Sequence, residues 1–139
     1  MIQLCPRPIL ATPQTMSPLK RALLAYDGSP KSEEALFVAT YISGQWQIPL
    51  DVVTVLENEN DASKNLDKAQ IYLEAHGVVA DYITREGPVA KTILNICEYI
   101  GADLLIMGGY GSNPLVEVVL GSVVDQVLRE CHTPTLICR

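Results

Sequence analysis

Glycine and proline divide this chain into short apolar runs and longer amphipathic runs, and that alternation limits the possible fold more than any other feature. Each of the nine glycines is expected at the edge of an element rather than inside one. The apolar runs have the length of buried strands, and the runs between them repeat apolar residues at helical spacing. Alternating strands and helices pair in parallel through right-handed crossovers, so we expect an α/β fold.

The pattern predicts five strands, with a helix after each of the first four. The strands are expected at residues 21–26, 50–56, 78–85, 104–107 and 135–138. The helices are expected from Pro30 to near Gly44, around Leu66 to His76, from Gly87-Pro88 to Gly101, and around Val123 to Cys131. The predicted architecture is a three-layer α/β/α sandwich around a five-stranded parallel sheet of order 3-2-1-4-5, whose final strand lies at an open edge.

Residues 1–19 fall outside this alternation and are interpreted as an N-terminal extension that precedes one domain at 20–139. The extension contains four prolines, and its segment Cys5 to Leu10 repeats the C-x-x-P-x-L pattern of Cys131 to Leu136. The repeat is either a coincidence in a short window or the last strand of a preceding copy. In the second case we expect Pro8 to Ala11 along a sheet edge, its own or a partner's. The alternative is a disordered tail.

Charge and cysteine usage exclude several classes of function. Ten basic and sixteen acidic residues give a net charge of −6, which disfavours binding to nucleic acid or to an anionic membrane. No apolar run is long enough to span a bilayer, and the N-terminus does not read as a signal peptide. The four cysteines form no CxxC pair, so we expect free thiols without a lowered pKa in a cytoplasmic protein. The two histidines fit no common zinc motif.

The most unusual residues follow the first and fourth expected strands. Ligands of an open parallel sheet bind beyond the carboxyl ends of the strands, where the strand order reverses. Asp27-Gly28-Ser29 follows the first strand, and a G-x2-G-x9-G-S run extends from Gly108 to Ser122 after the fourth. Glycine amides and a helix N-terminus can bind an anion, although a tight loop with a helix cap would also explain them.

These motifs resemble those of the universal stress protein family. The resemblance rests on Asp27-Gly28-Ser29, on Gly-Ala-Asp-Leu-Leu-Ile-Met-Gly from Gly101, on the glycine run and on the closing C-x-x-P-x-L-I strand. It covers residues 20–139. It implies an adenine nucleotide alpha hydrolase-like fold, ATP or ADP or AMP as ligand, and a homodimer formed by antiparallel pairing of the final strands.

The resemblance also implies roles for individual positions around the nucleotide. Asp27 is expected near the adenosine with Ala25 behind it, Val55 beside adenine, and Met107 with Gly108 at the ribose. The residues expected around the phosphates are Gly111, Gly121, Ser122 and Val123. Asp27 has an alternative role as a cap of the first helix, and core packing is the alternative for Val55 and Met107.

The glycine run departs from the family pattern because it lacks a cation. Ser112 stands where a basic residue is frequent, Tyr110 replaces the usual histidine, and Glu117 adds a negative charge. Phosphate binding would then depend on amides, a helix dipole and Mg²⁺ held through the phosphates. No nucleophilic triad or Walker loop is found, so any ATP hydrolysis is expected to be slow.

Two functions from different classes follow from these features. One is a nucleotide-binding stress-response switch or sensor, which the glycine run favours. The other is a dimeric interaction module that binds no nucleotide, which Ser112, Glu117 and the acidic composition favour.

Overall fold

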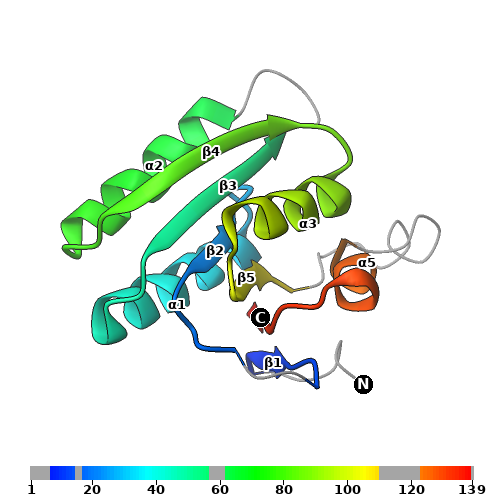
Figure 1. Cartoon of the computed structure of the whole chain (residues 1–139). Helices are drawn as coiled ribbons and strands as arrows, with labels where there is room; N and C mark the ends of the chain where they lie inside the picture. Colours follow the sequence, from blue (N-terminus) through cyan, green and yellow to red (C-terminus); the bar gives the residue numbers. More distant parts are fainter. Residues whose placement is uncertain (1–6, 15–16, 57–61, 110–122, 139) are drawn as a thin grey trace.

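The computed structural model describes residues 7–14, 17–56, 62–109 and 123–138. Within these residues the chain forms an α/β sandwich in which helices cover both faces of one mixed, mainly parallel sheet (Figure 1). The strands are β1 (Ile9–Ala11), β2 (Ala22–Ala25), β3 (Leu50–Leu56), β4 (Ala80–Glu86), β5 (Leu104–Gly108) and β6 (Thr135–Cys138). The helices are α1 (Pro30–Trp46), α2 (Ala62–Ala75), α3 (Val89–Ile100) and α5 (Val123–Glu130).

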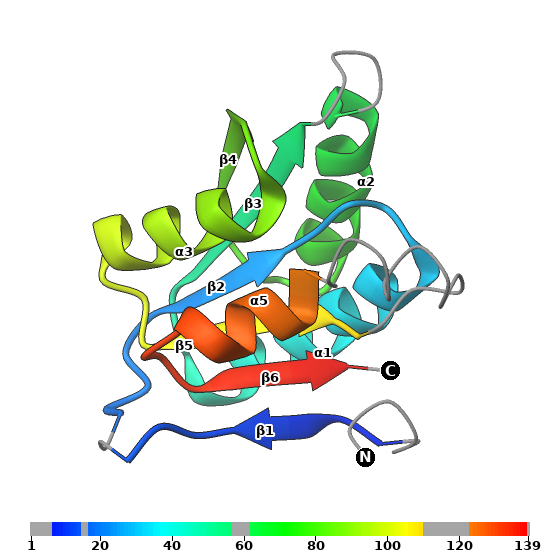
Figure 2. The ribbon, with the colours of Figure 1, turned by 90° about the vertical axis from the view of Figure 1, so that its right-hand side faces the viewer.

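The sheet has the order β1-β6-β5-β2-β3-β4. Strands β4, β3, β2, β5 and β6 pair in parallel, which confirms the predicted order 3-2-1-4-5 for those five. The predictions of five strands in all and of an open edge at the final strand are wrong. Strand β1 adds a sixth, antiparallel member on the outer side of β6 (Figure 2).

The pairing of β1 with β6 is centred on two residues that occupy equivalent places in the C-x-x-P-x-L repeat. Leu10 lies opposite Leu136, Ile9 lies opposite Ile137, and Ala11 lies opposite Thr135. Two copies of one strand related by a two-fold axis through this leucine would pair in the same register. Strand β1 therefore occupies the place that a second copy of β6 would take.

Helix α1 begins as the sequence predicts but continues past its expected end. Ser29 is its N-cap, whose hydroxyl accepts a hydrogen bond from the Ser32 amide at 3.3 Å, and Pro30 follows in the first turn. The helix ends beyond Gly44, at Gln47, which adopts a left-handed conformation with φ of 55°. The expectation that every glycine marks an element edge is therefore wrong for Gly44.

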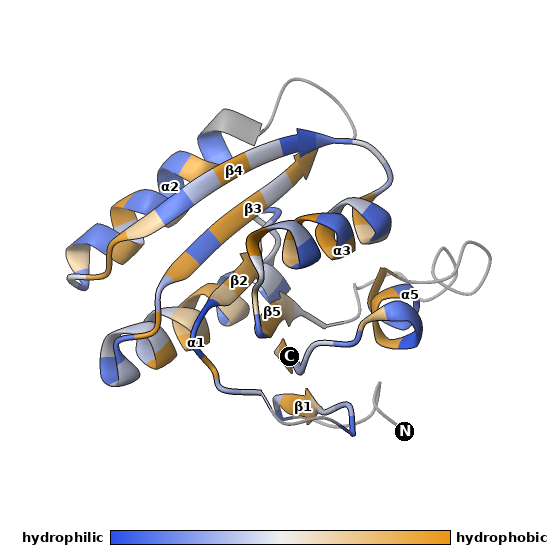
Figure 3. Cartoon of the chain, in the orientation of Figure 1, coloured by the Kyte–Doolittle hydropathy of each residue, from blue (hydrophilic) through white to orange (hydrophobic). Residues whose placement is uncertain are grey.

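Two apolar cores hold the layers together, one on each face of the sheet. Helices α1 and α2 pack on one face through residues such as Leu36 and Leu73, and helices α3 and α5 pack on the other through Ile93 and Val127. All four of these side chains are 3% exposed or less. The central strands β2 and β5 are apolar on both faces, as expected for parallel strands covered on both sides, whereas the edge strand β4 is largely polar (Figure 3). Among the described helices, none is both long and apolar enough to cross a bilayer.

Candidate functional site

The strand order reverses between β2 and β5, and the carboxyl ends of these two strands define the candidate site. Ala25 at the end of β2 pairs with Met107 in β5. The chain leaves β2 towards α1 and β3, whereas it leaves β5 towards α5 and β6 on the other side. Because α1 and α5 pack on opposite faces of the sheet, β2 and β5 mark the reversal point at which ligands of open parallel sheets bind.

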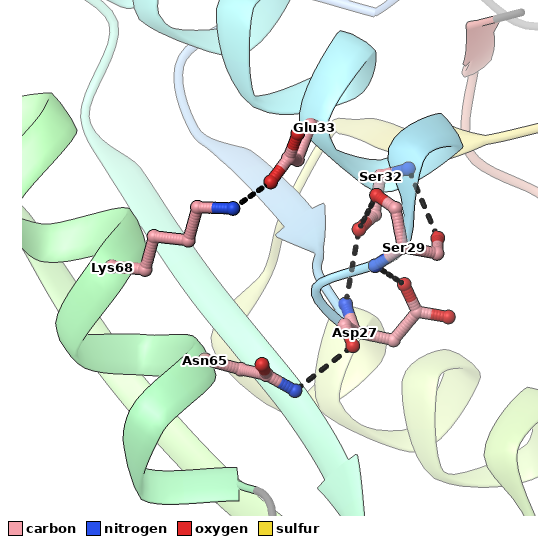
Figure 4. Close-up of polar contacts among 6 residues, drawn as sticks. All are labelled: Asp27, Ser29, Ser32, Glu33, Asn65 and Lys68. Atoms are coloured by element: carbon pink, nitrogen blue, oxygen red, sulfur yellow. Dashed lines mark hydrogen bonds and ion pairs between the residues drawn. The ribbon is translucent and has the colours of Figure 1, made fainter.

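Asp27 lies in the turn that follows β2, and its backbone and side chain are both tied to that turn (Figure 4). The Ser29 amide donates to Asp27 Oδ1 at 2.9 Å, and the Asp27 amide donates to Ser32 Oγ at 3.4 Å. The alternative role expected for Asp27, a cap of the first helix, belongs to Ser29 instead, and Asp27 stabilises the turn before that helix. Figure 4 shows the other carboxylate oxygen of Asp27 directed away from Ser29.

The Asp27 carboxyl is held in its charged form. Partial desolvation acts to raise its pKa, but hydrogen bonds from Ser29 and Ser32 together outweigh that effect and leave the pKa below its usual value. The residue itself is exposed. A fixed, ionised and accessible carboxylate is suited to accept hydrogen bonds from the hydroxyl groups of a ligand.

Helix α2 contributes residues that the sequence analysis did not select. Asn65 donates from Nδ2 to the Asp27 carbonyl at 2.9 Å, and Lys68 forms an ion pair with Glu33 of α1 (Figure 4). Gly28 has φ of +79°, a conformation that favours glycine. A Cβ there would also displace the Asn65 side chain from its contact with the Asp27 carbonyl.

Three apolar residues predicted to contact the nucleotide, Ala25 and Val55 near the adenosine and Val123 near the phosphates, lie on the same side of the sheet. Ala25 of β2, Val55 of β3 and Val123 at the start of α5 are all partly buried against the core between the sheet and the α3–α5 layer. Met107 is 5% exposed and belongs to that core. The partly exposed side chains of Ala25 and Val55 at the carboxyl end can cover a flat aromatic ring, whereas Met107 serves mainly in packing.

Gly108, the last residue of β5, is where the sheet meets the first turn of α1. A Cβ at Gly108 would lie 2.7 Å from the carbonyl carbon of Lys31 and 2.8 Å from the Ser32 nitrogen. Backbone therefore packs on backbone at this point, and glycine is required there whether or not a ligand binds. The same contact brings the backbone of Lys31 beside the end of β5, and its ammonium lies 3.9 Å from the Glu34 carboxylate.

Three of the predicted phosphate residues, Gly111, Gly121 and Ser122, lie outside the described residues. Of the residues that the sequence analysis missed, Ser32 had a local signal, since a serine three residues after an N-cap is well placed to bond the cap. Asn65 and Lys31 had none, because a tertiary contact brings each of them to this end of the sheet.

Comparison with known proteins assigns the family. The sequence model of the universal stress protein family matches residues 18–139. The chain belongs to the universal stress protein family. It is 33% identical over 141 residues to the universal stress protein Slr1230 of Synechocystis, in an alignment that includes the whole chain and 49% of that relative. The chain thus spans about half the length of this relative.

Solved structures of this family share the fold. A universal stress protein from Archaeoglobus fulgidus superimposes with a TM-score of 0.82 at 26% identity, over 95% of this chain and 49% of the other. Two further structures contain a nucleotide. A universal stress protein in complex with cAMP has a TM-score of 0.74 at 21% identity, over 86% of this chain and 97% of the other. One from A. fulgidus in complex with dAMP has a TM-score of 0.70 at 17% identity, over 86% and 97%.

Proposed function

We propose that this chain binds an adenine nucleotide at the carboxyl ends of β2 and β5 and acts as a nucleotide-dependent switch or sensor in a stress response. The observation that carries the proposal is the Asp27 turn, where an ionised carboxylate is fixed at the reversal point of the sheet. The cAMP and dAMP complexes of two proteins with this fold support the choice of an adenine nucleotide.

In this proposal the two faces of the site bind different parts of the ligand. The partly exposed Ala25 and Val55 cover the adenine, and Asp27 accepts hydrogen bonds from the ribose hydroxyls. Phosphates lie towards the glycine run and the N-terminus of α5, where helix amides favour an anion. The proposal includes ATP, ADP and AMP as ligands, and Mg²⁺ held through the phosphates would offset the lack of a Lys or Arg between Gly108 and Ser122.

Isothermal titration with adenosine, AMP, ADP and ATP tests the proposal, with and without Mg²⁺. Asp27→Asn is expected to weaken binding of all four about tenfold, because a hydrogen bond to a charged group contributes about 1.5 kcal/mol. Asp81→Asn is the matched control, since Asp81 lies near the amino end of β4 and also loses one negative charge. No binding by the unmodified protein, or equal affinities for the two variants, contradicts the proposal.

A dimeric interaction module remains the second candidate, favoured by Ser112, Glu117 and the acidic composition. A homodimer through the final strand requires that β1 first leaves the edge of β6, because β1 already pairs with the outer side of that strand. Native mass spectrometry of gently purified protein separates the two candidates. A bound adenine nucleotide supports the first, and a nucleotide-free dimer supports the second.

A further inference from the structure

Two thiols meet on the α3–α5 side of the sheet, next to the amino end of β6. Cys97 lies in α3 and is 3% exposed, and Cys131 follows the last residue of α5 and is partly buried. Both sulfurs contact Thr133: Cys97 Sγ lies 3.8 Å from Thr133 Oγ1, and Cys131 Sγ lies 3.4 Å from the Thr133 carbonyl oxygen. Each thiol also shifts the pKa of the other, as expected of two neighbours around one threonine. The chain separates these cysteines by thirty-three residues, so only the fold pairs them.

Cys131 is the member of the pair that carries negative charge more readily. The Thr133 amide donates to Cys131 Sγ at 3.4 Å, and the Thr135 hydroxyl lies 3.7 Å away. That hydroxyl also reaches the Thr133 carbonyl at 3.0 Å, so its single proton serves one acceptor at a time. The Thr133 carbonyl and the C-terminal end of α5 oppose a thiolate.

The neighbouring Cys97 thiol decides the direction in which the Cys131 pKa moves. It is the largest cause that lowers the pKa of Cys131 to about 5, against the opposing effect of burial. The Cys131 neighbour, together with burial and the nearby charge of Asp103, raises the pKa of Cys97. The expectation that neither thiol has a lowered pKa is therefore wrong for Cys131. The pKa of Cys138 moves in the opposite direction to that of Cys131, because burial and then Glu34 raise it to about 11.

A small cavity is lined in part by Cys131. It has a volume of about 120 Å³ and lies between the strand end of β1 and the α5–β6 connection. Its lining consists of Ala11, Thr12, Pro13, Leu128, Cys131, Thr133 and Thr135. This volume exceeds the roughly 10–15 Å³ that one water needs by the same measure, so a molecule of the size of H₂O₂ fits it.

We propose that Cys131 is a peroxide-reactive modification site and that Cys97 resolves it into an intramolecular disulfide. The Cys131 thiolate attacks one oxygen of hydrogen peroxide, the O–O bond breaks, and the released hydroxide takes up a proton to leave as water. Cys131 becomes a sulfenic acid. The Cys97 sulfur then attacks the Cys131 sulfur, the S–O bond breaks, and the Cys97 proton leaves with the hydroxyl as a second water. Two thiols are oxidised, and one peroxide is reduced to two waters.

Mass spectrometry of the full chain treated with one equivalent of H₂O₂ tests the outcome. A disulfide removes about 2 Da and joins the tryptic peptides 92–129 and 130–139, and fragment ions distinguish Cys131 from Cys138. Cys97→Ser is expected to stop the reaction at a sulfenic acid on Cys131, which dimedone traps. Cys131→Ser is expected to leave Cys97 reduced, and Cys138→Ala, as control, keeps the disulfide. A bridge that joins Cys138, or no oxidation of Cys131, overturns the proposal.

The reactivity of Cys131 can also be measured by alkylation of the unmodified protein, which does not depend on the folding of a variant. At pH 5.5 a thiol of pKa about 5 is mostly thiolate, whereas an ordinary thiol of pKa about 8.5 is about 0.1% thiolate. After correction for the lower nucleophilicity of the weaker base, Cys131 should react about twentyfold faster than the same cysteine in urea-unfolded protein. Equal rates, or slower labelling in the folded chain, would contradict the reactivity assigned to it.

The cavity is tested separately from the thiol chemistry. Ala11→Leu fills the entrance from β1 and is expected to slow oxidation by H₂O₂ at least severalfold. Leu10→Ala changes the neighbouring residue, whose side chain lies on the opposite face of β1 and is 54% exposed, so it should leave the rate unchanged. Equal slowing by both variants would mean that the cavity is not the path to Cys131.

Discussion

Gly108→Ala is the change for which the structure gives the most definite cost. The added methyl group would stand 2.7 Å from the Lys31 carbonyl carbon, 2.8 Å from the Ser32 nitrogen and 2.9 Å from the Lys31 oxygen. All three atoms are backbone, so no side chain can rotate away and the first turn of α1 must shift. Overpacking of this kind costs about 1–3 kcal/mol. For a domain of 139 residues, 2 kcal/mol corresponds to a fall in Tm of about 8 °C.

Urea unfolding measured by circular dichroism checks this cost, with Gly44→Ala as the matched control. Gly44 lies inside α1, and a Cβ there meets only Val78 Cγ2, at 3.6 Å. Alanine at that position is expected to stabilise the protein by up to about 1 kcal/mol through helix propensity. The two glycine substitutions should thus change stability in opposite directions. If Gly108→Ala unfolds at the urea concentration of the parent, the close backbone contact between β5 and α1 is wrong.

Three further predictions concern buried or charged groups. Tyr26→Phe should leave stability unchanged or raise it by about 1 kcal/mol in urea unfolding, because the Tyr26 hydroxyl is buried without a hydrogen-bond partner among the described residues. Arg21→Met should cost about 2 kcal/mol, because the Asp51 carboxylate, 4% exposed, would lose a partner that holds it at 2.7 and 3.0 Å; no loss would mean that solvent replaces the half-exposed arginine. Asp27→Asn should reduce the loss of unfolding free energy that the protein shows below pH of about 4. A carboxyl whose folded pKa is lowered stabilises the fold above its unfolded pKa, and that contribution disappears as the pH falls through the folded pKa. An unchanged loss between pH 2 and 5 would show that the bonds from Ser29 do not favour the charged form.

The parallel part of the fold could be predicted from the sequence because local signals and the global fold agree there. Glycine and proline mark the ends of most elements, and an apolar run such as Leu50 to Leu56 can only be buried as a central strand. Gly44 misled the prediction because helix packing overrides its low propensity. The sequence could not decide which strand β1 pairs with, since the repeat does not show whether the segment joins its own sheet or that of another molecule.

The candidate site was predictable only where its residues follow strands. Asp27 and Gly108 could be found because the carboxyl ends of β2 and β5 must meet in this topology. Asn65 lies on a different helix, and its contact with the Asp27 turn depends on how α2 packs. The same limit applied to Cys97 and Cys131, whose contact depends on the packing of α3 against the end of α5.

The strand β1 is tied to β2 by residues 12–21 only, and this short tether affects any contest for the edge of β6. A segment held by a short linker is present at its binding place at an effective concentration of about millimolar. A second molecule offering its β6 would pair in the register that β1 already uses, with Ile137 in place of Ala11 and Thr135 in place of Ile9. For equal strand affinities, the tether alone decides which strand occupies the edge. Free protein at micromolar concentration is therefore outcompeted roughly a thousandfold by the chain's own N-terminal strand. Cleavage anywhere between β1 and β2 would remove that advantage and turn the edge into a concentration-dependent contact.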